Sequence, residues 1–167
     1  MTMPAASSLT TEEIVEISKE SDVALLQTRV RALADELGFP PTVQSQIQVA
    51  ASEAATNILK FAHRGRIILR TNMGDEVYLE FEAADHGSGI PDLKLAFKDG
   101  HSEGCDLTQA DYNPSRRGLG FGLGAMKRML DEMLIYTGDE QGTRIIGRKY
   151  LLRSQQKLKS GGGKHER

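Results

Sequence analysis

Apolar residues recur at two periods along the chain, and these periods divide it into helices and strands. Spacings of three and four residues over 23–37 and 43–62 predict two amphipathic helices, and Gly38 is a typical stop for the first. The same spacing predicts a third helix over 123–133. Small side chains in the middle of the second helix indicate that it packs closely against a sheet.

Strands are predicted where β-prone residues form short runs or alternate with polar ones. A first strand is expected at 13–17, and two pairs of such segments flank short polar turns, which is typical of β-hairpins. The paired segments are 66–70 with 76–81 and 134–137 with 143–146. This order of elements is that of an α/β two-layer sandwich, a mostly antiparallel mixed sheet that helices cover on one face.

One domain is expected at residues 12–153, between a disordered N-terminus at 1–11 and a flexible polar tail at 154–167. Within the domain, the segment at about 93–117 contains glycine and proline with little apolar periodicity. Irregular loops longer than about 12–15 residues are usually functional in a compact domain. We therefore expect this segment to be a lid.

The composition narrows the class of protein. The 167 residues carry a formal net charge of −2, which gives no electrostatic reason to expect nucleic acid or an anionic membrane as the main partner. No apolar run approaches the roughly 20 residues of a membrane-spanning helix, and the N-terminus lacks a signal-peptide pattern, so a cytoplasmic protein is expected. The single cysteine, Cys105, excludes an intramolecular disulfide.

Three segments carry candidate chemistry, and the first lies on the second predicted helix. Glu53 and Asn57 are four residues apart, so their side chains emerge on the same edge of the helix. A carboxylate can accept a proton from an attacking hydroxyl, and an amide oxygen is a hard ligand suited to Mg²⁺. On spacing alone, such a pair is more often two ordinary solvated residues.

The second segment is Asp85-His-Gly-Ser-Gly-Ile-Pro91, which directly follows a strand. Gly87 and Gly89 allow the backbone to approach a planar ligand closely, and a carboxylate at a strand end can accept a hydrogen bond from an exocyclic amine such as that of adenine. In isolation, a motif of this kind is more often a simple tight turn.

The third segment contains alternate glycines before the third helix, at Gly118, Gly120, Gly122 and Gly124. A row of backbone N–H groups beside a helix N-terminus suits a polyphosphate, although a flexible hinge is the alternative. Two other nucleotide motifs are excluded: no GxxxxGK[ST] occurs, and the GxGxxA match at 120–125 does not follow a strand.

Taken together, the three segments resemble the N, G1 and G2 boxes of the GHKL (Bergerat-fold) ATPases and kinases, in the same order. Gly142 and Thr143 resemble the part of that fold whose threonine closes the adenine pocket. Within the superfamily, roughly residues 12–150 are most similar to the small anti-sigma-factor-type serine/threonine kinases, and in particular to the switch kinases of stressosome signalling. The stretch at 100–117 is longer than the lid of those kinases.

The resemblance implies the Bergerat ATP-binding fold, ATP and Mg²⁺ as cofactors, and a role for each motif residue. Glu53 becomes the candidate general base, and Asn57 the Mg²⁺ ligand. Asp85 becomes the adenine-recognising carboxylate, and the alternate glycines become the phosphate loop. The residues implied to bind the nucleotide are Asn57, Asp85, Gly87, Gly89, Gly118, Gly120, Gly122, Gly124 and Thr143.

The function that the resemblance implies is a serine/threonine protein kinase that phosphorylates a STAS-domain scaffold or antagonist protein in a stress-signalling partner switch. On release, such a kinase activates a downstream partner such as a phosphatase. Two alternatives stay open. One is a nucleotide-dependent, anti-sigma-factor-like module that sequesters its partner. The other is the ATP-binding half of a histidine kinase, which would need a phosphoacceptor histidine on a separate chain.

Overall fold

The protein is a two-layer α/β sandwich. The computed structural model describes residues 10–90, 92–93, 97, 101–102, 105–106, 122–138 and 140–155. Its principal helices are α1 (Glu20–Glu36), α2 (Pro41–Phe61) and α4 (Gly122–Met129). The strands of its main sheet are β1 (Thr10–Ile17), β2 (Gly65–Asn72), β3 (Tyr78–Asp85), β6 (Glu132–Gly138) and β7 (Gly142–Tyr150).

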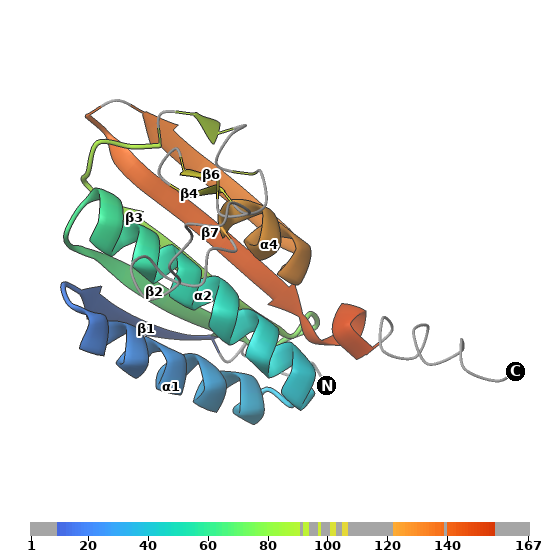
Figure 1. Ribbon diagram of the computed structural model, residues 1–167. Helices are drawn as coiled ribbons and strands as arrows, with labels where there is room; N and C mark the ends of the chain where they lie inside the picture. The colour runs from blue at the N-terminus through green and yellow to red at the C-terminus, as the bar shows by residue number, and fades with distance from the viewer. Residues whose placement is uncertain are drawn as a thin grey trace, which may run out of the picture.

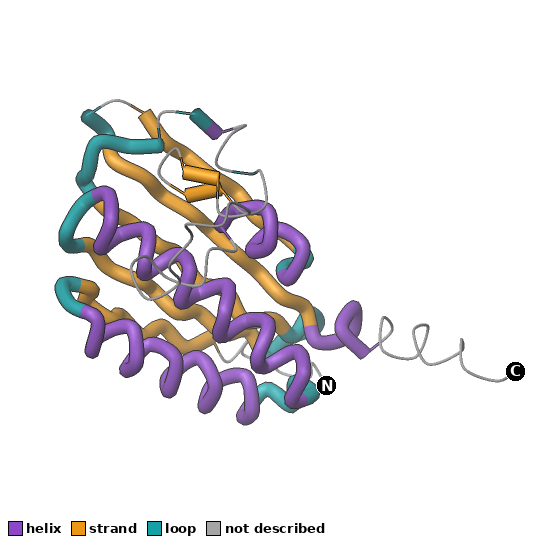
Figure 2. Tube along the Cα trace, viewed as in Figure 1, coloured by secondary structure: helices purple, strands orange, loops and turns teal. Residues whose placement is uncertain are grey.

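The main sheet has the strand order β1-β2-β3-β7-β6, and each neighbouring pair is antiparallel. Helices α1, α2 and α4 lie on one face of this sheet (Figure 1), and the Cα trace shows the same two layers (Figure 2). The predicted fold class and order of elements are therefore confirmed. Among the helices in the described part of the chain, none combines the length and the apolar composition that crossing a bilayer requires.

Local sequence accounts for the ends of the first two helices. Asp22, in the first turn of α1, accepts hydrogen bonds from the backbone N–H groups of Ser18 and Lys19 at 2.9 and 3.0 Å, which fixes the entry of the chain. After α1, Gly38 adopts a φ of +81°, a conformation that favours glycine, so the predicted stop is confirmed. Pro41 begins α2, where the missing N–H of proline has no helical partner to lose.

The core fills the space between the helices and the sheet. Four alanines of α2 are buried, and their small side chains allow this helix to lie close to the strands. Larger apolar side chains from both layers surround them. Those that are almost completely buried include Ile17, Leu26, Ile47, Ile58, Ile67, Leu69, Leu79, Phe81, Met126 and Ile145.

The prediction for the third helix is wrong at the C-terminal end of the helix. We expected it to include Leu130 and Met133, but α4 ends at Met129, and Met133 lies in β6 opposite Gly147. The backbone N–H of Asp131 donates to the Arg148 carbonyl at 3.0 Å, so pairing with β7 begins at this residue and the helix cannot continue. The apolar spacing continues past the helix only because Met133 and Ile135 alternate on the covered face of β6.

Other element boundaries differ by a few residues. Strand β1 begins at Thr10, before the expected domain start at 12, and residues 151–155 form a helical turn beyond β7. In the predicted lid at about 93–117, β4 (His101–Ser102) pairs antiparallel with β5 (Cys105–Asp106). Apart from Leu93 and Phe97, the rest of that segment lies outside the described residues.

The sheet face that points away from the helices, here called the open face, carries charged side chains in register. Glu12, Arg70, Glu80, Arg148 and Glu132 are paired in turn across all five strands, so acidic and basic side chains alternate in one row. Within this charged row, ion pairs join Arg70 to Glu12 and Glu80, at 2.8 and 3.0 Å, and Arg148 to Glu80.

Candidate functional site

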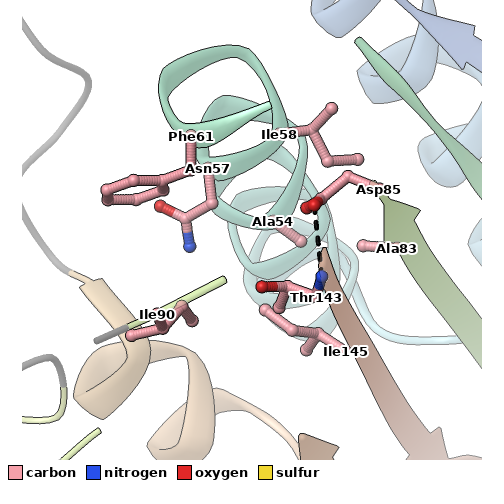
Figure 3. Close-up of a pocket in the computed structure, with 9 residues that line it drawn as sticks. All are labelled: Ala54, Asn57, Ile58, Phe61, Ala83, Asp85, Ile90, Thr143 and Ile145. Atoms are coloured by element: carbon pink, nitrogen blue, oxygen red, sulfur yellow. Dashed lines mark hydrogen bonds between the residues drawn. The ribbon is translucent and has the colours of Figure 1, made fainter. Parts of the chain in front are cut away.

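A pocket lies where the C-terminal half of α2 faces the ends of β3 and β7 (Figure 3). It encloses about 250 Å³ of space, part of which is open to solvent. Most of its walls are apolar, and three polar side chains reach it from different elements, a combination typical of small-molecule sites. The lining residues are Ala54, Asn57, Ile58, Phe61, Ala83, Asp85, Ile90, Thr143 and Ile145.

Asp85 ends β3 and is fixed by backbone donors from two directions. Its Oδ1 accepts the N–H of Gly87 at 2.9 Å and the N–H of Thr143 at 3.1 Å. Its Oδ2 has no hydrogen-bond partner within the described part of the chain. A carboxylate with one oxygen fixed and the other open to a pocket can accept a hydrogen bond from a ligand N–H group.

Two glycines allow the backbone to come this close to Asp85. A Cβ at Gly142, which has a φ of +74°, would lie 2.1 Å from the Asp85 carbonyl oxygen. A Cβ at Gly87 would lie 2.4 Å from the Phe61 carbonyl oxygen at the end of α2. Any side chain at these positions would force the turn after β3 away from α2 and β7.

Gly89, the other glycine of the predicted G1 box, lies against the β6–β7 hairpin. Its φ is +78°, and a Cβ there would lie 2.7 Å from the Gly138 carbonyl oxygen. Next to it, the Ile90 N–H donates to the Thr137 Oγ1 at 2.8 Å. The turn therefore places Ile90 in the wall of the pocket.

Thr143 enters the pocket from β7. It is 8% exposed, and its Oγ1 lies 3.1 Å from the Oγ1 of Thr137 on β6. Its backbone N–H donates to the Asp85 carboxylate, and its side chain lines the pocket. Thr143 therefore fixes Asp85 and also supplies a polar group of its own.

Asn57 lines the pocket from α2, on the opposite side from Asp85 and Thr143, and its amide lies near Phe61 and Ile90 (Figure 3). This amide has no hydrogen-bond partner within the described residues. An amide oxygen in that situation suits a hard cation such as Mg²⁺ or a polar group of a ligand.

Glu53 lies one helical turn before Asn57, and it is buried, with 7% of its surface exposed. Both residues lie within α2, as expected. Glu53 is not among the described residues that line the pocket.

The predicted phosphate loop falls partly outside the described residues, which do not include Gly118 and Gly120. Gly122 and Gly124 lie in the first turn of α4, and Gly122 has a φ of +59°. Helix α4 packs beside α2. Its N-terminal backbone amides provide the partial positive charge that phosphate groups favour.

Sequence reasoning missed the apolar walls and one polar residue. Ala83 precedes Asp85 by two positions and Ile145 follows Thr143 by two, so the period of a strand places each pair on one face. This two-residue period is visible in the sequence, so Ala83 and Ile145 could have been predicted as pocket residues. Thr137 gave no comparable signal, because its importance depends on being directly opposite Thr143.

Comparison with known proteins gives a consistent result. The family model described as "Histidine kinase-like ATPase domain" matches residues 17–149. The chain is 33% identical over 141 residues to the serine/threonine-protein kinase RsbT of Bacillus subtilis (strain 168), which covers 84% of this chain and 97% of that protein.

Two further relatives carry other names. The chain is 28% identical over 148 residues to an anti-sigma F factor of Caldanaerobacter subterraneus subsp. tengcongensis, covering 86% of this chain and 95% of that protein. It is 26% identical over 141 residues to the serine-protein kinase RsbW of Bacillus cereus (strain G9842), covering 83% of each chain. The resemblance that the three motifs indicated is thus confirmed.

Proposed function

The chain belongs to the histidine kinase-like ATPase domain family, and on that premise we propose that it is a cytoplasmic serine/threonine protein kinase. It uses Mg-ATP to phosphorylate a STAS-domain scaffold or antagonist protein in a stress-signalling partner switch. Once released from that protein, it activates a downstream regulator such as a phosphatase. The names of the relatives, two kinases and an anti-sigma factor, support a role in partner switching.

The observation that carries the nucleotide part of this proposal is the geometry of Asp85. Two backbone N–H groups occupy Oδ1, and the mostly apolar walls of the same pocket suit a purine ring. An exocyclic amine would donate to Oδ2, and the ring would lie between the side chains of α2 and those of β3 and β7.

Asn57 fits the implied Mg²⁺ because its amide faces the pocket with no partner in the described structure. When bound, Mg²⁺ would neutralise charge on the phosphates of ATP. The chain's own residues then have three tasks: Asp85 orients the base, the turn at Gly122 and Gly124 contacts phosphates, and Glu53 accepts the proton of the substrate hydroxyl. Positioning and charge stabilisation supply most of the acceleration in phosphoryl transfer.

The direct test incubates the purified protein with γ-labelled ATP and candidate STAS-domain proteins. We expect label on a serine or threonine of the STAS protein, identified by phosphopeptide mapping. The control is the Asp85→Asn variant, which should transfer no label under the same conditions. Nucleotide binding without transfer to any STAS protein would rule out the kinase proposal.

The second candidate function is a nucleotide-dependent module that sequesters its partner without modifying it. The similarity to an anti-sigma F factor favours this candidate. It predicts that ADP and a non-hydrolysable ATP analogue change partner affinity while the partner stays unphosphorylated. The labelling experiment and a pull-down in the two nucleotide states therefore separate the candidates.

The Mg²⁺ assignment has its own test, because Asn57→Ala removes only the amide. We expect this variant to lose affinity for Mg-ATP by about tenfold or more, since a ligand to a cation is lost. Its affinity for metal-free ATP should change by less than about threefold. Titration calorimetry with Mg²⁺ and with EDTA measures both, and equal losses in the two conditions would remove Asn57 from the metal site.

A further inference from the structure

Strand β6 borders the main sheet and has one free edge (Figure 1). It pairs with β7 on one side, and no strand in the described part of the chain pairs with its other side. Alternate residues of a strand bond to opposite neighbours, so about half of the backbone N–H and C=O groups of β6 point away from the sheet. Such an edge is a template for pairing with another strand.

The two edge strands of the sheet differ in how they are protected against such pairing. Charged side chains discourage it, and β1 carries three glutamates among its eight residues. Strand β6 carries one charged residue, Glu132, at its first position, and the following residues, 133–138, include no charge and no proline. The sheet therefore has one protected edge and one unprotected edge.

Two large apolar side chains are exposed next to the unprotected edge. Leu134 and Tyr136 are 54% and 55% exposed, and their two-residue spacing places both on the open face. Ile146 lies beside Leu134 on β7 and is partly exposed. These three side chains form an apolar patch that ends at the free edge of β6.

The sequence of β6 complements itself when a second copy runs antiparallel to it. A register centred on Ile135, the midpoint of the strand, pairs all seven residues. Leu134 then lies opposite Tyr136 of the second copy, and by symmetry this aliphatic–aromatic pair occurs twice. Glu132 lies opposite Gly138 of the second copy, so no like charges meet.

The charges near this edge are balanced within one chain. Glu132 lies 3.6 Å from Arg148 and 3.6 Å from Arg153. Arg144 forms an ion pair with Glu82, and its guanidinium lies 5.7 Å from the centre of the Tyr136 ring. A second copy therefore covers the patch without leaving one of these charges unpaired.

We propose that two copies of this chain associate edge to edge through β6 and form one continuous antiparallel sheet of ten strands. The two-fold axis of such a pair is perpendicular to the sheet, so the helices of both copies lie on the same face. Leu134 and Tyr136 of both copies then form one apolar cluster across the two-fold axis. The contact is smaller than the roughly 800 Å² per partner of a standard interface, so we expect a dissociation constant of about 1–100 μM.

Sedimentation velocity of the full chain, over a concentration series that brackets this range, measures the association. We expect a monomer–dimer equilibrium in the unaltered protein. Leu134→Lys should raise the dimer dissociation constant by about tenfold or more, because the lost contact occurs twice and lysine protects an edge strand. Circular dichroism should show a normal fold, since the replaced side chain is 54% exposed.

Ile14→Lys is the matched control. Ile14 lies on the same open face, is 55% exposed and belongs to β1, the other edge strand. We expect its dimer dissociation constant to stay within about twofold of that of the unaltered protein. Equal weakening by Ile14→Lys and Leu134→Lys would overturn edge pairing in favour of stacked open faces, and a chain that stays monomeric throughout the series would overturn the proposal outright.

Disulfide crosslinking tests the register, in a Cys105→Ser background that removes the native thiol. Directly opposite residues have Cα atoms about 4.5–5.5 Å apart, which a disulfide can span, whereas diagonal neighbours lie about 7–8 Å apart. A mixture of Leu134→Cys and Tyr136→Cys chains should therefore form a linked dimer under mild oxidation, and neither variant alone should do so.

Crosslinking of either cysteine variant with itself, or none in the mixture, would overturn the proposed register. This second measurement also decides the matter if Leu134→Lys does not fold. The proposal does not depend on the proposed function, because neither Leu134 nor Tyr136 is among the described residues that line the pocket. Its failure would therefore leave the nucleotide site as proposed.

Discussion

Asp85 uses its two carboxylate oxygens differently. Oδ1 accepts the backbone N–H groups of Gly87 and of Thr143, the latter 58 residues further along the chain than Asp85, so it ties the turn after β3 to β7. Oδ2 has no hydrogen-bond partner in the described part of the chain, and Asp85 lines the pocket. Because the structural bonds converge on one oxygen, a substitution that preserves that oxygen separates folding from ligand recognition.

Asp85→Asn is such a substitution. Its amide oxygen can replace Oδ1, but an NH₂ group then faces the ligand amine, donor against donor. We expect the variant to fold normally and to lose about 100-fold or more in ADP affinity, measured by calorimetry. Asp75→Asn, at an exposed carboxylate in the β2–β3 turn, is the matched control and should bind like the unaltered protein. Unchanged ADP affinity in Asp85→Asn would remove Asp85 from base recognition.

The role proposed for Glu53 is proton transfer, so its removal should affect turnover and spare binding. Glu53→Gln keeps the shape of a side chain that is 7% exposed. We expect phosphoryl transfer to fall by about 10²–10⁴-fold, the usual contribution of a general base, with ADP affinity within about threefold. Single-turnover transfer from labelled ATP measures the first quantity, and Glu36→Gln on the exposed side of α1 is the control. A variant that retains full transfer would show that another group accepts the proton.

The polar residues of the site were predictable to different degrees. Asn57, Asp85 and Thr143 stand in or beside local motifs, and the structure brings them to one pocket. Thr137 was not predictable, because a threonine in a strand is ordinary until a cross-strand register places a second hydroxyl 3.1 Å from it.

At the scale of elements, the position of α4 depends on a buried lysine of β7. The Lys149 Nζ donates to the Met129 carbonyl, at the C-terminal end of α4, at 2.7 Å. It also lies 3.9 Å from the Asp131 carboxylate, and the two side chains are 4% and 2% exposed. A cation at a helix C-terminus complements the helix dipole, so this contact fixes α4 against the sheet.

Lys149→Met removes that cation while filling most of the same space. We expect it to lower the free energy of unfolding by about 2–3 kcal/mol, the range of a charge-assisted hydrogen bond in a buried setting. Urea unfolding followed by circular dichroism measures this. Lys127→Met, on the exposed side of α4, should change stability by no more than about 0.5 kcal/mol. Equal effects of the two variants would mean that the Met129 contact contributes nothing specific.

Element type was easier to predict than element ends. Helices α1 and α2 each have an apolar stripe and a terminal signal, Gly38 for one and Pro41 for the other. The junction of α4 and β6 has no such terminal signal, and its apolar residues fit the spacing of a helix as well as the alternation of a strand. Only the backbone bond from Asp131 to Arg148, which is a long-range contact, shows where the helix stops.

At the scale of the whole molecule, the open face of the sheet follows from registers that no local pattern specifies. The sequence shows alternating residues in each strand, but the charged row requires five strands aligned in register. One consequence is that Glu80 and Glu82 are only 6% and 7% exposed on a face that no described helix covers. Arginines from the neighbouring strands enclose them.

Glu82 shows how this network changes protonation. Burial by itself raises the pKa of Glu82, but hydrogen bonds from Arg144 and Arg70, at 2.5 and 2.7 Å, more than offset it. The pKa of Glu82 therefore lies below its ordinary value of about 4.3. The folded state then binds fewer protons than the unfolded state near that pH, so the contribution of Glu82 to stability is complete above about pH 4.3 and is lost as the pH falls through the folded pKa.

Glu82→Gln tests this linkage because glutamine cannot titrate. At pH 7 we expect the variant to be less stable by about 1–2 kcal/mol, a modest value because Arg144 and Arg70 are partly exposed and therefore screened. The difference should shrink as the pH falls below about 4.3 and through the folded pKa of Glu82, where only the unaltered protein loses a charge. Urea unfolding across this range measures the difference, with Glu16→Gln, an exposed carboxylate on β1, as the control. A difference that does not shrink at any acid pH at which both proteins still fold would mean that Glu82 acts through packing and that its charge is not needed on the open face.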